Sequence, residues 1–184
     1  MEDNAVALAY TAWQIALTAA KNLHAEDFAY ESDEQRVGIL SEYLFFLIHV
    51  ADRRAYDSMD LESRRRFVTA MAREAGRHYQ RNLEDIWGAD NYRDAFLETL
   101  NERNTEYADT RFSDQGPEYE AFRCLGVKVQ DIMGMSQTNR WVIQQVMDID
   151  GPQAAMELAK AMDNLLHTAQ PEIRTRDFSV AGPD

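Results

Sequence analysis

The hydrophobic pattern of the chain is dominated by the stretch from Gly38 to Tyr56. At about 100° per residue, its apolar side chains cover most of the circumference of a helix and not a single stripe. Helices of this kind lie inside a bundle, where neighbouring helices cover every side. The pattern therefore predicts a buried central helix over about residues 34–57, with Ser32 or Asp33 as its N-cap.

Elsewhere apolar positions recur at the three- and four-residue spacing that is typical of amphipathic helices. Short polar, glycine and proline segments separate them, the clearest being Ser113–Pro117. The other predicted helices cover about residues 4–24, 61–87 (capped by Asp60 and ended by Gly88), 92–108, 117–133, 138–148 and a last helix from Asp150-Gly151-Pro152. The sequence thus predicts an all-α, single-domain bundle of six to seven mostly antiparallel helices over residues 1–168, with a mobile tail over 169–184.

The predicted helix over residues 61–87 has an apolar and a basic face. Its apolar face, expected in the core, comprises Leu61, Val68, Met71, Ala72, Ala75, Tyr79, Leu83 and Ile86. The opposite face carries an arginine row, Arg66, Arg73, Arg77 and Arg81. The next helix carries an acidic row, Asp94, Glu98, Glu102 and Glu106. The two rows are candidates for pairing with each other, although two solvated helix faces are the simpler interpretation. In the first helix, Tyr10, Trp13 and Leu17 are expected to pack in the core.

Charge and cysteine content indicate which partners and which cellular compartment to expect. The net charge is −13, from 19 basic and 32 acidic residues, which opposes binding to a phosphate backbone or an anionic membrane. We therefore expect no nucleic-acid and no membrane partner. A lone cysteine, Cys124, forms no internal disulfide, and the start Met1-Glu2-Asp3 is acidic where a secretory signal is basic. These features predict a cytoplasmic protein.

Three polar residues, Glu42, His49 and Arg53, follow one line along the central helix, with Asp52 beside them. A buried carboxylate or imidazole without a partner costs several kcal/mol or changes its protonation, so this line needs partners. In a hairpin with the following helix, His78 lies within about one turn of Glu42, which favours a Glu42–His78 pair. These five residues are the candidate ligand-binding site.

The sequence carries no recognisable catalytic or metal motif. Helix bundles that hold metals commonly use Glu-x-x-His on two helices, and this pattern does not occur. The possible ligands also do not form one compact metal site easily, so we predict no metal and no cofactor; they are Glu42, His49, Asp52, Glu74 and His78. A nucleophile elbow and a Walker-type lysine are likewise lacking. Residues 136–141 have the composition of a DNA-reading helix start, but also of an ordinary helix cap.

Two functions remain open. The preferred one is a non-enzymatic protein-interaction or regulatory domain that self-associates as a dimer or binds another protein. Methionine is frequent near the C-terminus, and methionine-rich surfaces adapt to varied partners. The candidate surface comprises Arg66, Arg73, Arg77, Arg81, Met135 and Trp141. The alternative is a bundle that binds a small molecule or a metal through Glu42, His49 and Arg53 with His78. A cavity beside the polar line favours the alternative, whereas an exposed apolar patch favours the interaction domain.

Overall fold

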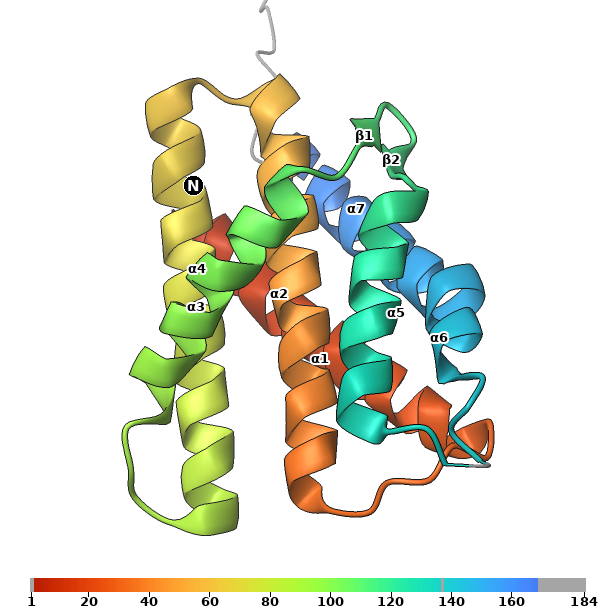
Figure 1. The fold of residues 1–184 in the computed structure, drawn as a ribbon. Helices are drawn as coiled ribbons and strands as arrows, with labels where there is room; N and C mark the ends of the chain where they lie inside the picture. Colours follow the sequence, from red (N-terminus) through yellow and green to blue (C-terminus); the bar gives the residue numbers. More distant parts are fainter. Residues whose placement is uncertain (1, 137, 169–184) are drawn as a thin grey trace, which may run out of the picture.

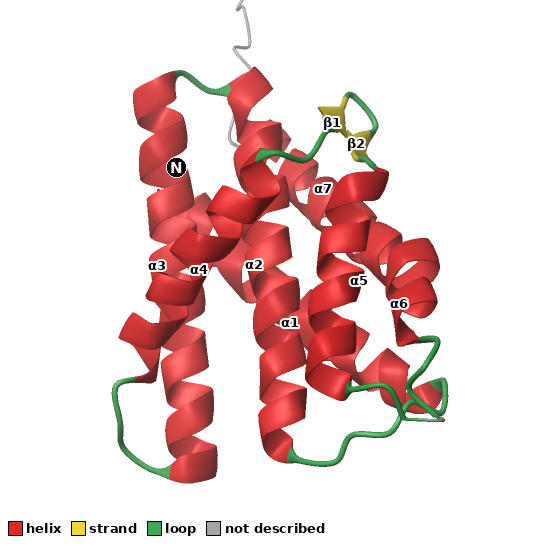
Figure 2. Ribbon diagram, viewed as in Figure 1, coloured by secondary structure: helices red, strands yellow, loops and turns green. Residues whose placement is uncertain are grey.

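The computed structural model describes residues 2–136 and 138–168, and these residues form a helical bundle around one central helix (Figures 1 and 2). Its helices are α1 (Glu2–Ala25), α2 (Asp33–Ser58), α3 (Leu61–Trp87), α4 (Tyr92–Ala108), α5 (Tyr119–Met133), α6 (Val142–Gln145) and α7 (Gly151–Thr168). Strands β1 (Phe112–Ser113) and β2 (Gly116–Pro117) form a small hairpin. The all-α prediction is confirmed. The predicted tail, 169–184, lies outside the described residues.

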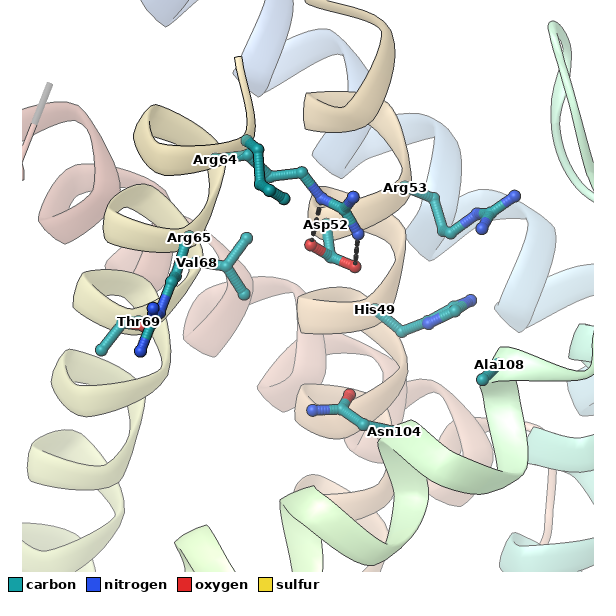
Figure 3. A pocket seen from close by; sticks show the side chains of 10 residues that line it. His49, Asp52, Arg53, Arg64, Arg65, Val68, Thr69, Asn104 and Ala108 are labelled. Carbon is teal, nitrogen blue, oxygen red and sulfur yellow. Dashed lines mark hydrogen bonds and ion pairs between the residues drawn. The ribbon is translucent and has the colours of Figure 1, made fainter. Parts of the chain in front are cut away.

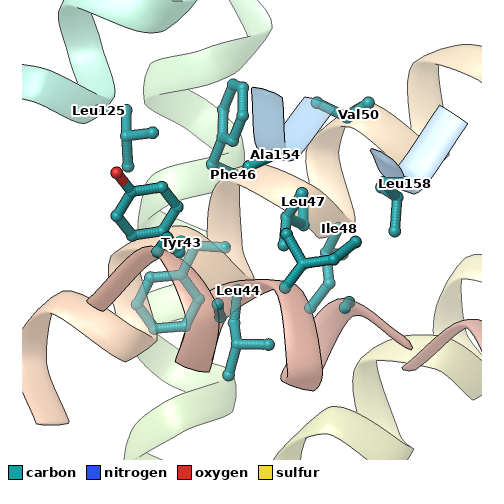
Figure 4. Close-up of a cluster of buried hydrophobic side chains, with 14 of the residues drawn as sticks. Tyr43, Leu44, Phe46, Leu47, Ile48, Val50, Leu125, Ala154 and Leu158 are labelled. Atoms are coloured by element: carbon teal, nitrogen blue, oxygen red, sulfur yellow. The ribbon is translucent and has the colours of Figure 1, made fainter. Parts of the chain in front are cut away.

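Helix α2 is the centre of the bundle, as its apolar circumference predicts. Residues 39–51 are buried without exception, because α1, α3, α4, α5 and α7 all pack against α2. Figure 4 shows Tyr43 and Phe46 of α2 in one apolar cluster with Leu125 of α5 and Leu158 of α7. Covering α2 on all sides removes its apolar surface from water, which is the main stabilising term of such a core.

The predicted caps fix both ends of the α2–α3 hairpin. The Ser32 hydroxyl accepts a hydrogen bond from the Gln35 N–H at 3.4 Å, and the Asp60 carboxylate accepts from the N–H groups of Glu62 and Ser63 at 3.0 Å each. These bonds satisfy backbone donors that the first helical turn leaves free. The short link at Met59 turns α3 back along α2 (Figure 1).

One predicted helix start, at Pro117, and one predicted break, before the last helix, are wrong, whereas α7 begins at Gly151 as predicted. Pro117 lies in β2, opposite Phe112 of β1, and α5 begins only at Tyr119. The second break, at Asp150-Gly151-Pro152, does not interrupt the chain, because α6, a π turn over Val146–Asp150 and α7 follow one another directly. A proline ring clashes with the carbonyl four residues earlier in an α-helix. We attribute the passage through Pro152 to the wider π turn, which moves that carbonyl away.

Three side chains expected in the core are exposed: Tyr10, Leu61 and Ile86. Leu61 and Ile86 lie at the two ends of α3. In the middle of α3, Met71, Ala75 and Leu83 are buried as expected, and Phe67, outside the expected face, is buried more completely than Val68. No helix in the described part of the chain is both long and apolar enough to cross a membrane.

Candidate functional site

Glu42 is buried, as predicted, but its partner is Arg103 of α4 and not His78. Only 5% of Glu42 is exposed. Arg103 donates three hydrogen bonds to its two carboxylate oxygens, at 2.8, 2.9 and 3.1 Å. These bonds raise the pKa of Arg103, against the opposing effect of its own burial. The pair therefore fixes α4 against α2.

His78 lies on a different side of the bundle from Glu42. Its ring is 5.9 Å from the rings of both Tyr10 and Trp13 on α1, and its Nε2 is 3.8 Å from a Glu74 oxygen. The predicted Glu42–His78 pair is wrong because α1 covers His78, whereas α4 reaches Glu42.

Asp52 is held by an arginine of the facing helix. The Arg64 guanidinium donates two hydrogen bonds to the Asp52 carboxylate, at 2.7 and 2.6 Å, in the bidentate geometry that arginine favours. These bonds raise the pKa of Arg64. The same guanidinium lies 5.0 Å from the centre of the Tyr56 ring. Arg64 thus joins α3 to α2 close to the link at Met59 (Figure 3).

A pocket of about 450 Å³ opens beside this pair, between α2, α3 and α4 (Figure 3). Short side chains leave the space unfilled on two of these helices, Thr69 on α3 and Ala108 on α4. The full lining comprises His49, Asp52, Arg53, Leu61, Arg64, Arg65, Val68, Thr69, Asn104 and Ala108. This volume lies within the usual range for small-molecule sites. Three of the five predicted ligand-binding residues, His49, Asp52 and Arg53, therefore meet at one pocket, and Glu42 and His78 do not line it.

His49 is the most distinctive residue of the pocket wall. It is 5% exposed, and its ring stacks on Tyr107 with 5.1 Å between ring centres and an interplanar angle of 21°. Its Nε2 is buried and has no hydrogen-bond partner. Burial lowers the pKa of His49 to about 4, with Arg53 and Arg64 adding to this effect and Asp52 opposing it. His49 is consequently a neutral imidazole at pH 7.

The charge of the pocket is opposite to that of the whole chain. Three arginines and one aspartate line it, while the chain carries −13. Asp52 neutralises Arg64, but neither Arg53 nor Arg65 has an ion pair with any carboxylate of residues 2–136 and 138–168. Arg53 lies 5.8 Å from the centre of the Phe112 ring, and Arg65 is exposed at the rim. Arg53 and Arg65 therefore line the pocket without an ion-pair partner among the described residues, and the Arg53 guanidinium lies against Phe112.

The arginine row and the acidic row do not pair with each other. Arg66 is joined to Glu2 at 3.3 Å and Arg77 to Glu74 at 2.7 Å, while Arg73 and Arg81 are exposed. In the acidic row, Glu106 is bound by Arg103 of the same helix and by Lys128 of α5. No ion pair between the two rows occurs in the part of the chain that the structure describes.

The C-terminal apolar residues are divided between core and surface. Met133 and Met162 are buried, whereas Met135 is 75% and Trp141 57% exposed. The Arg140 guanidinium lies 5.3 Å from the centre of the Trp141 ring. Exposure of Met135 and Trp141 is compatible with the interaction surface predicted from the sequence, which stays a prediction.

Asn139, in the segment considered as a DNA-reading helix start, has a structural role. Its side chain accepts a hydrogen bond from the Ala29 N–H at 2.9 Å and donates to the carbonyls of Ala29 and Met133 at 3.0 and 3.1 Å. It therefore joins the loop before α2 to the end of α5. Because these bonds occupy a side chain that is almost fully buried, Asn139 is not free to read a base edge.

Sequence reasoning missed the two arginines that pair with the polar line. Arg103 stands between Leu100 and Tyr107 at spacings of three and four, which places it on the buried face of α4. Arg64 stands in the same way between Leu61 and Val68. An arginine in an apolar row indicates a buried acidic partner, and this signal was available in the sequence.

The described residues contain no group of three histidine, cysteine or acidic side chains arranged to hold a metal ion. No protein-family model, curated protein or solved structure matches the chain. The geometry of the pocket is therefore the main evidence for function.

Proposed function

We propose that the chain is a small-molecule-binding helical bundle whose ligand is an organic anion with a carboxylate or phosphate group. The ligand binds in the pocket between α2, α3 and α4. The observation that carries the proposal is His49, a buried imidazole with an unpartnered Nε2, in the wall of a cavity that also has two unneutralised arginines. A cavity beside the polar line is also the feature that favours ligand binding over an interaction domain.

The pocket residues have distinct roles in this proposal. Arg53 and Arg65 attract the anionic group, which arginine binds through paired N–H donors. Nε2 of neutral His49 is buried, so the ring contributes at most one hydrogen bond, through Nδ1, to a hydroxyl or amide of the ligand. Val68 and Ala108 contact its apolar part. Asp52 keeps Arg64 in place, and the Glu42–Arg103 pair holds the α4 wall.

Isothermal titration calorimetry with three probes of similar size tests the proposal. Phenyl phosphate and benzoate carry the proposed anionic groups, and benzyl alcohol is the uncharged control. We expect saturable binding of at least one anion and none of the alcohol. Arg65→Glu should weaken anion binding at least about tenfold, because it replaces an attraction by a repulsion at the rim. Arg81→Glu, an exposed site on the same helix outside the pocket, is the matched control. Equal effects of the two substitutions would refute the proposal.

Self-association is a second candidate function, favoured by the exposure of Met135 and Trp141. Sedimentation equilibrium over a wide range of protein concentration tests it. We expect a dimer that Trp141→Ser weakens, and a wild-type protein that stays monomeric at all concentrations would contradict this candidate.

A further inference from the structure

A second pocket, of about 430 Å³, lies at the other end of the α2–α3 hairpin, and α1 contributes to its wall. Its apolar lining comes from three helices: Leu17 and Ala20 of α1, Val37 and Leu40 of α2, and Ile86 of α3. None of these residues belongs to the site proposed above. Ile86 keeps 43% of its surface exposed here, which leaves apolar surface for a ligand to cover.

The polar residues of this second pocket include two cations and one carboxylate. They are Lys21, His24, Tyr30, Asp33, Arg36 and Asn82. Arg36 is already engaged, because it lies 3.1 Å from an Asp33 oxygen and 5.7 Å from the centre of the Tyr30 ring. Lys21 has no ion pair with any carboxylate that the structure describes. One unneutralised ammonium group therefore stands beside an apolar cavity.

The aromatic part of the wall is held in place by a strong hydrogen bond. The Tyr30 hydroxyl donates to the Ala20 carbonyl at 2.7 Å, and the His24 and Tyr30 ring centres are 6.3 Å apart. Burial raises the pKa of Tyr30 to about 12, so the hydroxyl stays neutral and keeps this bond at physiological pH. The bond ties the segment before α2 to α1 and keeps the pocket formed without a ligand.

We propose that this second pocket binds an amphipathic carboxylate, with its hydrocarbon part between α1, α2 and α3 and its head group beside Lys21. The pocket matches such a ligand in two ways. Apolar side chains line the interior, and burying hydrocarbon there is favourable in proportion to the area removed from water. The single unneutralised cation at the mouth matches a single negative charge. The volume is adequate for a small hydrocarbon ligand.

Methyl NMR and calorimetry with decanoate, below its micelle concentration, test this inference, and decanol is the uncharged control. We expect saturable decanoate binding that shifts the methyl signals of Leu17, Val37 and Leu40. Lys21→Glu should weaken decanoate at least fivefold and leave decanol unchanged, while Lys160→Glu, an exposed lysine on α7, should change neither. Shifts confined to other methyl groups, or equal effects of the two lysine substitutions, would overturn the proposal.

Two further variants separate this pocket from the first one. Ile86→Glu should abolish decanoate binding, with Ile149→Glu as the matched exposed isoleucine, and both surface substitutions leave the core intact. Arg65→Glu, which changes the pocket between α2, α3 and α4, should leave the decanoate-induced shifts of the Leu17, Val37 and Leu40 methyl groups unchanged. If Arg65→Glu weakened these shifts as strongly as Lys21→Glu, the second pocket would not be an independent site.

Discussion

Removing the Glu42 carboxylate should destabilise the protein markedly. Glu42→Ala leaves the Arg103 guanidinium facing a buried space from which its three hydrogen bonds are lost. Breaking a fully buried pair by deleting one partner costs about 3–5 kcal/mol. Arg103 keeps a second contact, to Glu106 at 3.1 Å, and its side chain is 16% exposed. Both reduce the loss, so we expect a decrease of about 2–4 kcal/mol in the free energy of unfolding.

Urea unfolding of a double-mutant cycle measures this quantity. The cycle compares Glu42→Ala, Arg103→Ala and the double variant, and the double variant should lose less than the sum of the two single losses. Arg66→Ala is the control, because it breaks an exposed pair with Glu2 and should cost no more than about 0.5 kcal/mol. A loss within about 0.5 kcal/mol for Glu42→Ala would show that the pair contributes nothing and would refute the reasoning.

Three further predictions concern titration and packing. The pKa of His49 falls from 6.5 to about 4 on folding, so the unfolded state takes up the proton first. The free energy of unfolding therefore decreases by about 3 kcal/mol as pH falls from about 6.5 to 4. His49→Gln should remove this decrease, as measured by urea unfolding at several pH values. The pKa of Asp150 rises from 3.8 to about 6 through burial, so folding favours its protonated form and stability is lost as pH rises from about 4 to 6. Asp150→Asn should remove this loss of about 3 kcal/mol in the same assay. An unchanged pH profile of the variant would contradict the prediction. Gly126→Ala should cost about 1–3 kcal/mol in thermal unfolding, because the new Cβ would stand 2.9 Å from Met147 Cγ and 3.1 Å from the Ile143 carbonyl oxygen; a stabilised variant would contradict the close contact.

Local signals predicted most of the helices. The all-round apolar pattern of α2 and the caps at Ser32, Asp60 and Gly88 depend on residues close in sequence, and each was identified. The start of α7 at Gly151 was predicted, but the break before it was wrong, because the π turn that makes the chain continuous there has no clear sequence pattern of its own. Likewise, a two-residue strand at Pro117 is too short for a periodic signal.

The candidate site was predicted only in part, for a geometric reason. The short link predicts the α2–α3 hairpin, and the all-round apolar pattern of α2 predicts the burial of Glu42 and His49. Which helix covers each side of that hairpin depends on long-range packing, and α4 reaches Glu42 where the sequence favoured His78. The pocket depends on the same packing, since it needs α4 to bring Asn104 opposite α3.

The central claim is that an organic anion binds in the pocket beside His49. The ¹⁵N chemical shifts of the His49 imidazole during a titration with phenyl phosphate test it most directly, because the ring lines the pocket. We expect a saturable shift in the wild-type protein. At the same probe concentration, Arg65→Glu should remove this shift and Arg81→Glu should retain it. An imidazole signal that stays unchanged up to saturating probe in the wild-type protein would contradict it.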